Sequence, residues 1–107
     1  MERSPTAATL STNGARGEVV AKLAGAERRL CLTLGALAEI ETGLGLEGLS
    51  DLAERMRALS ARDLMTVLAA LLRGGGERGL ADDLGRAGVD PREAAEAVAK
   101  AFAAAAG

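Results

Sequence analysis

The spacing of large apolar residues divides the first half of the chain into two regions. Such residues recur at every second position over residues 19–23 and again over residues 30–34, with a short turn at residues 24–26 between them. A period of two is typical of a strand with one buried face, and two such segments around a tight turn indicate a β-hairpin. We therefore predict a hairpin over residues 16–33.

From residue 34 the apolar period lengthens to three or four residues, which is the period of a helix with one buried face. The residues on this expected buried stripe are Leu34, Leu37, Ile40 and Leu44. Thr33 stands directly before the stripe, and its hydroxyl suits the N-cap position of a helix. We expect a helix from Leu34 to about Gly43.

The clearest helix start in the chain is the capping box formed by Ser60 and Asp63, a hydroxyl at the N-cap and a carboxylate three residues later. The apolar stripe that follows is expected to be buried, and it consists of Leu64, Val67, Leu68, Leu71 and Leu72. A run of three glycines over residues 74–76 then ends the helix.

Three other segments carry helix signals. A short amphipathic helix is expected after Gly48, another is expected from about Leu80 to Ala87, and Asp90 followed by Pro91 opens the last helix. The chain thus predicts an α+β fold, mostly α, with an N-terminal β-hairpin followed by about five short helices in one small domain. This domain covers residues 15–107, and the polar residues 1–14 are interpreted as a disordered leader.

The amino-acid composition argues against several classes of function. The chain has 107 residues, 13 basic and 15 acidic side chains, and a net charge of −2. This balance does not favour binding to nucleic acid, for which a clustered basic face is expected, and Phe102 is the single aromatic residue. No apolar run approaches the length of a membrane span, and the N-terminus lacks the apolar segment of a secretion signal. We therefore expect no nucleic-acid or membrane partner and a location in the bacterial cytoplasm.

The residue types needed for catalysis or metal binding are scarce. The chain has no histidine, and Cys31 is its only cysteine, so neither a histidine base nor an intrachain disulfide is available. Residues 43–48 match the pattern G-x-G-x-x-G, but they follow a helix instead of a strand, which favours a helix-to-helix joint over a nucleotide site. Asp82 and Asp83 are interpreted as solvated charges, with Asp82 paired to Arg86. The sequence predicts no enzymatic activity, no cofactor and no metal site.

Four segments carry a resemblance to a known family. They are NGARGEV at residues 13–19, ERRLCLTLGALAEIE at 27–41, LSARDL at 59–64 and RGGG at 73–76. Together they resemble the small tail proteins of gene transfer agents and related siphophage-like elements, over about residues 13–107. This family is described as gene transfer agent tail proteins or phage tail assembly chaperones, and its motifs are structural.

The resemblance implies a role in building the tail of a phage-like particle. The first expectation is a tail assembly chaperone that holds the tape measure protein in a soluble state, with the tail tube protein as a second partner. One alternative is a structural, tube-associated component of the tail. The other is a helical adaptor, unrelated to phage, that binds some other protein. The tube alternative requires an extended sheet that continues around a ring, whereas this chain predicts only one hairpin.

A hairpin with two open edges suggests a place for a partner chain to bind. An exposed strand edge can accept an extended segment as an additional strand. The residues predicted to bind a partner are Val20, Arg28, Arg29 and Cys31. For Arg28 and Arg29, the sequence alone favours a charged guard on an exposed strand over a phosphate contact.

The capping box generates a first testable prediction. Replacing Ser60 with alanine removes the acceptor for one backbone N–H at the start of the helix and should lower the free energy of unfolding by about 1 kcal/mol. Urea denaturation measures this change. An unchanged denaturation midpoint would mean that the helix begins elsewhere.

Overall fold

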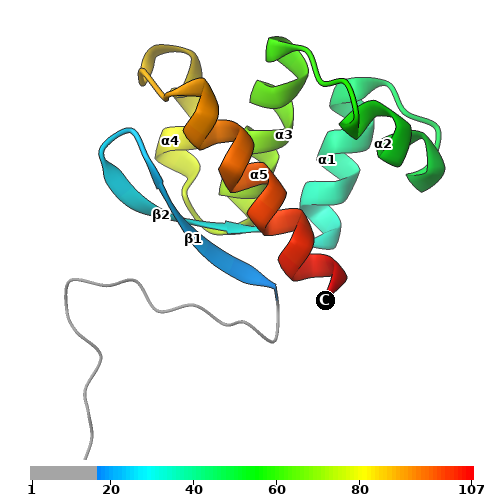
Figure 1. Cartoon of the computed structure of the whole chain (residues 1–107), viewed down its shortest axis with the longest axis horizontal. Coiled ribbons are helices and arrows are strands. Elements are labelled where there is room, and N and C mark those ends of the chain that lie inside the picture. The colour runs from blue at the N-terminus through cyan, green and yellow to red at the C-terminus, as the bar shows by residue number, and fades with distance from the viewer. Residues whose placement is uncertain (1–16) are drawn as a thin grey trace, which may run out of the picture.

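A computed structural model of the chain describes residues 17–107, and Figure 1 shows the arrangement of its elements. The hairpin consists of β1 (Glu18–Leu23) and β2 (Ala26–Cys31). The helices are α1 (Leu34–Leu44), α2 (Leu49–Met56), α3 (Ala61–Gly74), α4 (Arg78–Asp82), the short 3₁₀ helix η2 (Leu84–Arg86) and α5 (Pro91–Ala106). The α+β prediction of a hairpin followed by about five helices is confirmed. The expected leader at residues 1–14 lies outside the described residues, and the boundary at residue 15 stays a prediction.

The two strands pair in an antiparallel register that runs from Leu23 opposite Ala26 to Glu18 opposite Cys31. Ala24 and Gly25 connect them, and both residues have positive φ angles, 53° and 81°. A two-residue turn with two positive φ angles has the twist that matches a hairpin. Glycine adopts this backbone conformation at little cost, which explains why the turn forms at this dipeptide.

Side-chain caps begin three of the helices at the positions that the sequence predicts. The hydroxyl of Thr33 accepts a hydrogen bond from the N–H of Ala36 at 3.0 Å. Ser60 accepts one from the N–H of Asp63 at 3.0 Å, which confirms the start of α3. The carboxylate of Asp90 accepts one from the N–H of Arg92 at 2.8 Å at the start of α5. Each cap satisfies a backbone donor that the helix itself leaves without a partner.

One predicted feature of the helices needs adjustment, and another is as expected. The helix expected from Leu80 to Ala87 is divided into α4 and η2, because the backbone at Asp83 leaves the helical region, with φ −110° and ψ 16°. The glycine pattern at residues 43–48 is a joint, as interpreted from the sequence. Gly45 ends α1 in the left-handed conformation, and Gly48 directly precedes α2.

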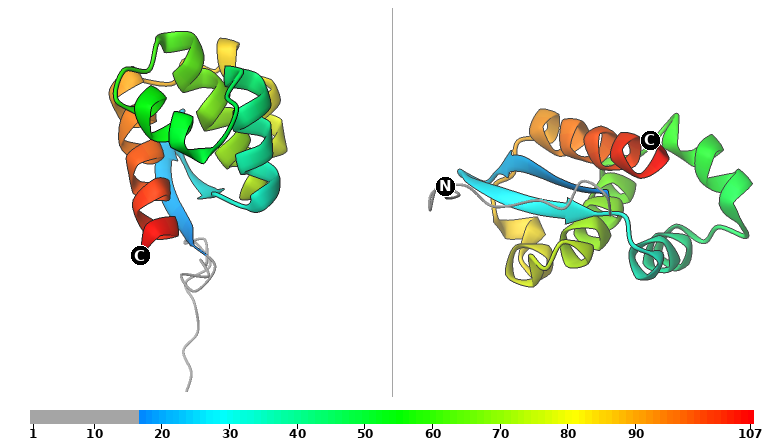
Figure 2. Two further views of the ribbon diagram at one scale, coloured as in Figure 1. Left: turned by 90° about the vertical axis from the view of Figure 1, so that its right-hand side faces the viewer. Right: turned by 90° about the horizontal axis from the view of Figure 1, so that it is seen from below.

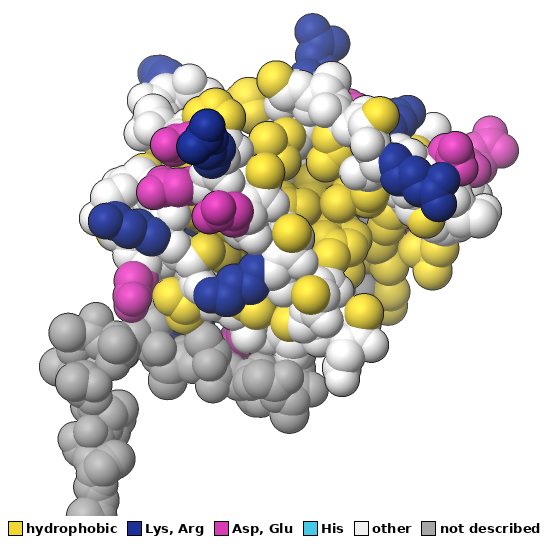
Figure 3. Space-filling view, viewed as in Figure 1, with side chains coloured by type: hydrophobic (Ala, Val, Ile, Leu, Met, Phe, Trp, Pro, Cys, Tyr) yellow, Lys and Arg dark blue, Asp and Glu magenta, His cyan; other side chains and the backbone are white. Residues whose placement is uncertain are grey.

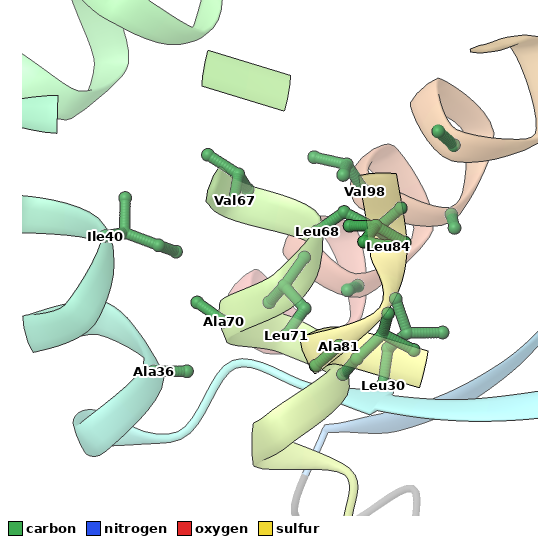
Figure 4. Packing of buried hydrophobic residues seen from close by; sticks show 14 of the residues in the cluster. Leu30, Ala36, Ile40, Val67, Leu68, Ala70, Leu71, Ala81, Leu84 and Val98 are labelled. Carbon is green, nitrogen blue, oxygen red and sulfur yellow. The ribbon is translucent and has the colours of Figure 1, made fainter. Parts of the chain in front are cut away.

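The core lies around α3, which packs against α1 on one side and against α5 and the hairpin on others (Figures 1 and 2). Figure 4 shows Ile40 and Ala36 of α1 directed toward Ala70 and Val67 of α3. The largest fully buried side chains are Leu23, Leu30, Ile40, Leu68, Leu71, Leu72 and Val67. This core is almost entirely aliphatic, and no charged or polar residue among residues 17–107 is buried.

The predicted buried stripe of α1 is wrong at Leu34, which is 83% exposed. The helix faces the core through Ala36, Ile40 and Leu44, which follow one another at intervals of four residues. Leu34 lies on a different side of the helix, and Leu37 is only half-buried. The apolar pattern alone did not reveal this rotation, because the small residue Ala36 gives a weaker signal than Leu34.

This rotation of α1 leads to a prediction with a matched control. Leu68 is 1% exposed, so Leu68→Asp buries a charge in the aliphatic core and should abolish cooperative folding. Leu34→Asp introduces the same carboxylate at an exposed position and should change the free energy of unfolding by no more than about 0.5 kcal/mol. Thermal melts followed by circular dichroism distinguish the two. A near-wild-type melt for Leu68→Asp would contradict this core.

Candidate functional site

The four residues predicted to bind a partner occupy different environments on the hairpin. Val20 and Arg29 pair across the two strands, and the outward N–H of Arg29 and the outward carbonyl of Val20 bond to side chains outside the hairpin. Val20, Arg28 and Arg29 are half-buried, whereas Cys31 is 4% exposed. Cys31 is therefore poorly available to a partner. The partner-binding role of these residues stays a prediction. The elements that pack on each strand edge limit where a partner strand could pair.

The outer edge of β2 is occupied by the end of α3. A Cβ atom on Gly74 would overlap the carbonyl oxygen of Cys31, and one on Gly75 would overlap the carbonyl oxygen of Arg29. The backbone of the α3 terminus thus lies directly against the strand. Only glycine permits such a close approach between two main chains, so the glycine run serves packing as well as helix termination.

Glu77 completes the cover of the β2 edge. Its Oε2 atom accepts a hydrogen bond from the outward N–H of Arg29 at 3.0 Å, and its Oε1 atom lies 3.9 Å from Nη1 of Arg28. Arg28 also donates through Nε to the carbonyl of Leu23 at 3.3 Å. Sequence reasoning missed Glu77, because a residue 48 positions from its partner carries no local signal.

The outer edge of β1 lies beside α5 (Figure 2). Lys100 reaches across from α5 and donates a hydrogen bond from Nζ to the carbonyl oxygen of Val20 at 2.6 Å. Covering a strand edge with a helix is a common protection against pairing with another chain. The expectation of an unprotected hairpin edge is therefore wrong, because both edges are at least partly covered by elements from later in the chain.

The acidic residues of the α4–η2 region form ion pairs. Asp82 accepts a hydrogen bond from Arg73 at 3.2 Å, and Arg73 also contacts Glu39 of α1. Arg86 pairs with Asp83 at 3.0 Å, so the expected pair between Asp82 and Arg86 is not formed. Within residues 17–107, no group of three or more metal-ligating side chains could hold an ion.

A hydrophobic hollow is visible on the face shown in Figure 3, between α5 and the α1–α2 region. Two helices border this hollow, because α1 and α5 each pack on α3 without packing closely on each other. Apolar side chains with intermediate burial occur on all three helices, among them Leu37, Leu64 and Phe102. The hollow is the most extensive apolar feature of this face, and the sequence pattern did not reveal it.

These features define a small, mostly helical protein with an apolar hollow on one face. In the part of the chain that the structure covers, no helix combines the length and apolar character of a membrane span. A family model described as phage tail tube protein, GTA-gp10, matches residues 16–107. Because the match covers most of the chain, the protein belongs to this family of phage and gene transfer agent tail proteins. No curated protein and no solved structure matches the chain.

The contact between α3 and β2 predicts a strong dependence on Gly75. Gly75→Ala forces a methyl group against the backbone of Arg29 and should destabilise the protein by about 1–3 kcal/mol. Gly79→Ala is the matched control, since nothing lies within 4 Å of a Cβ at that helical position. The control should be neutral or stabilising by up to about 1 kcal/mol. Equal urea midpoints for both variants would contradict the close approach.

Proposed function

We propose that this protein is a structural, tube-associated component of the tail of a phage-like gene transfer agent particle. The observation that carries the proposal is the family match over residues 16–107, whose description is that of a tail tube protein. In this role the protein contacts other tail proteins and remains in the finished particle.

The geometry indicates what kind of tail component this would be. The wall of a tube built from sheets needs strands that continue from one subunit to the next. The only sheet within residues 17–107 has two strands, and α3, Glu77 and Lys100 occupy its edges. We therefore favour contacts through helices over a continuous sheet, and a position on the tube over a position in its wall.

A second candidate is a tail assembly chaperone that binds the tape measure protein before the tube polymerises around it. The specific observation that favours this candidate is the combination of covered strand edges with an open apolar hollow between α1 and α5. Such a surface suits transient binding of an apolar segment from a client. The tail tube protein would be a second partner in this role.

Quantitative mass spectrometry of purified particles distinguishes the two candidates. A structural component should be present at a fixed ratio to the tail tube protein and should persist after washing in high salt. A chaperone should be absent from finished particles, should co-purify with the tape measure protein from cells, and should increase its soluble fraction on co-expression.

Deletion of the gene provides the matching control. Either role predicts that the deletion removes normal tails, as counted by electron microscopy, and that the wild-type gene supplied in trans restores them. Normal tails in the deletion strain would contradict both candidates.

A further inference from the structure

The hollow between α1 and α5 has the geometry of an incomplete helical bundle. Both helices pack on α3, which forms the floor, and a space separates them on the face shown in Figure 3. In a bundle of four helices, a further helix would lie in this position and contact all three. The side chains of α5 and α1 that line this space determine whether a further helix could bind there.

The α5 wall carries no charged side chain from Ala95 onward. Helical spacing groups Ala95, Ala99, Phe102 and Ala106 on one side of α5, adjacent to the buried Val98. The three alanines are exposed and Phe102 is half-buried. Glu93, Glu96 and Lys100 lie on another side of α5, and Arg92 flanks the stripe at the start of the helix, seven residues before Ala99. Small side chains on a helix surface let a neighbouring helix approach closely, because packing distance depends on side-chain size.

The α1 wall adds larger apolar groups and one charge. Leu34, Leu37 and Glu41 follow one another at helical spacing, on a side of α1 next to the core-facing residues. Glu41 is half-buried and forms no ion pair within residues 17–107. A half-buried carboxylate beside an apolar surface favours a basic side chain on whatever covers it.

The far end of the hollow is bounded by α2, which projects from the body of the protein (Figure 2). This helix packs extensively against no other element, its only buried residue is Leu52, and Leu49 is 59% exposed. Gly45 and Gly48 flank the segment that joins it to α1. Arg55 links this helix to α3 and α1 by hydrogen bonds, but its apolar packing is sparse enough for it to adjust to an occupant without disturbing the core.

We propose that the groove bounded by α1, α3 and α5 binds an amphipathic helix of a partner protein, with its apolar stripe on α5 and α3 and a lysine or arginine beside Glu41. The inference deepens the proposed function and rests on it for the view that the partner is another tail protein. Large aliphatic side chains of the partner would fill the space over the alanines. A helix is the expected form of the occupant, since the covered strand edges leave little backbone for an extended segment to pair with.

The test uses a displayed library of helix-forming peptides of about 18 residues, long enough for five turns, selected on the wild-type protein. The enriched peptides should carry aliphatic residues at helical spacing with a basic residue at the flank. Ala95→Arg places a charge in the groove and should weaken their binding at least about tenfold, because the guanidinium would be buried against an apolar stripe. Ala103→Arg is the matched control, since this exposed alanine lies toward the charged side of α5, and binding should change less than about twofold.

A charge exchange tests the role of Glu41. Glu41→Lys should weaken binding of the selected peptides several-fold, and replacing their basic flank with glutamate should restore it. Circular dichroism melts of each variant establish that the fold is retained. If Glu41→Lys is poorly folded, Glu41→Gln with the same peptides should give a smaller loss in the same direction.

Three outcomes would overturn the proposal. One is that no selected peptide distinguishes Ala95→Arg from Ala103→Arg. Another is that sedimentation shows a wild-type dimer that Ala95→Arg dissociates, which would make a second copy of this chain the occupant. The third is that a peptide of residues 1–16 competes with the selected peptides, which would make the chain's own N-terminal segment the occupant. None of these results depends on finding the protein in particles, so the groove and the tail role can fail separately.

Discussion

The close approach of the α3 terminus to the edge of β2 organises much of this protein. Gly74 and Gly75 place backbone directly against the carbonyl groups of Cys31 and Arg29, at a distance that excludes any side chain. This contact fixes how the hairpin lies on the central helix. It also brings Glu77 to the outward N–H of Arg29, so that a strand edge that could bind another chain is satisfied within the same molecule.

The covered edges shift the candidate site from the hairpin to the helices. A two-stranded sheet is marginal alone, and here the helices that stabilise it also occupy its edges. The core uses leucine, valine, isoleucine and alanine almost exclusively. Because α1 and α5 pack on α3 without packing closely on each other, the space between them leaves apolar surface available to a partner.

The family match and the geometry of the sheet indicate different aspects of the function. The family match identifies a tail protein, and its description favours a structural component. The two-stranded sheet with occupied edges instead favours contacts made through helices. Both features are compatible with a tube-associated protein. The chaperone role stays a prediction, because the groove indicates binding of an apolar segment but not how long that binding lasts.

Local features of this protein could be derived from the sequence, because they depend on residues close together in the chain. The hairpin turn and the caps at Thr33, Ser60 and Asp90 each involve groups no more than three residues apart. The exposure of Leu34, by contrast, depends on which side of α1 meets α3. Contacts over 48 and 80 residues cover the hairpin edges, and the groove exists only because two helices pack on a third without meeting. The tertiary structure decided these features, since a sequence pattern shows which face of an element is apolar but not what covers it.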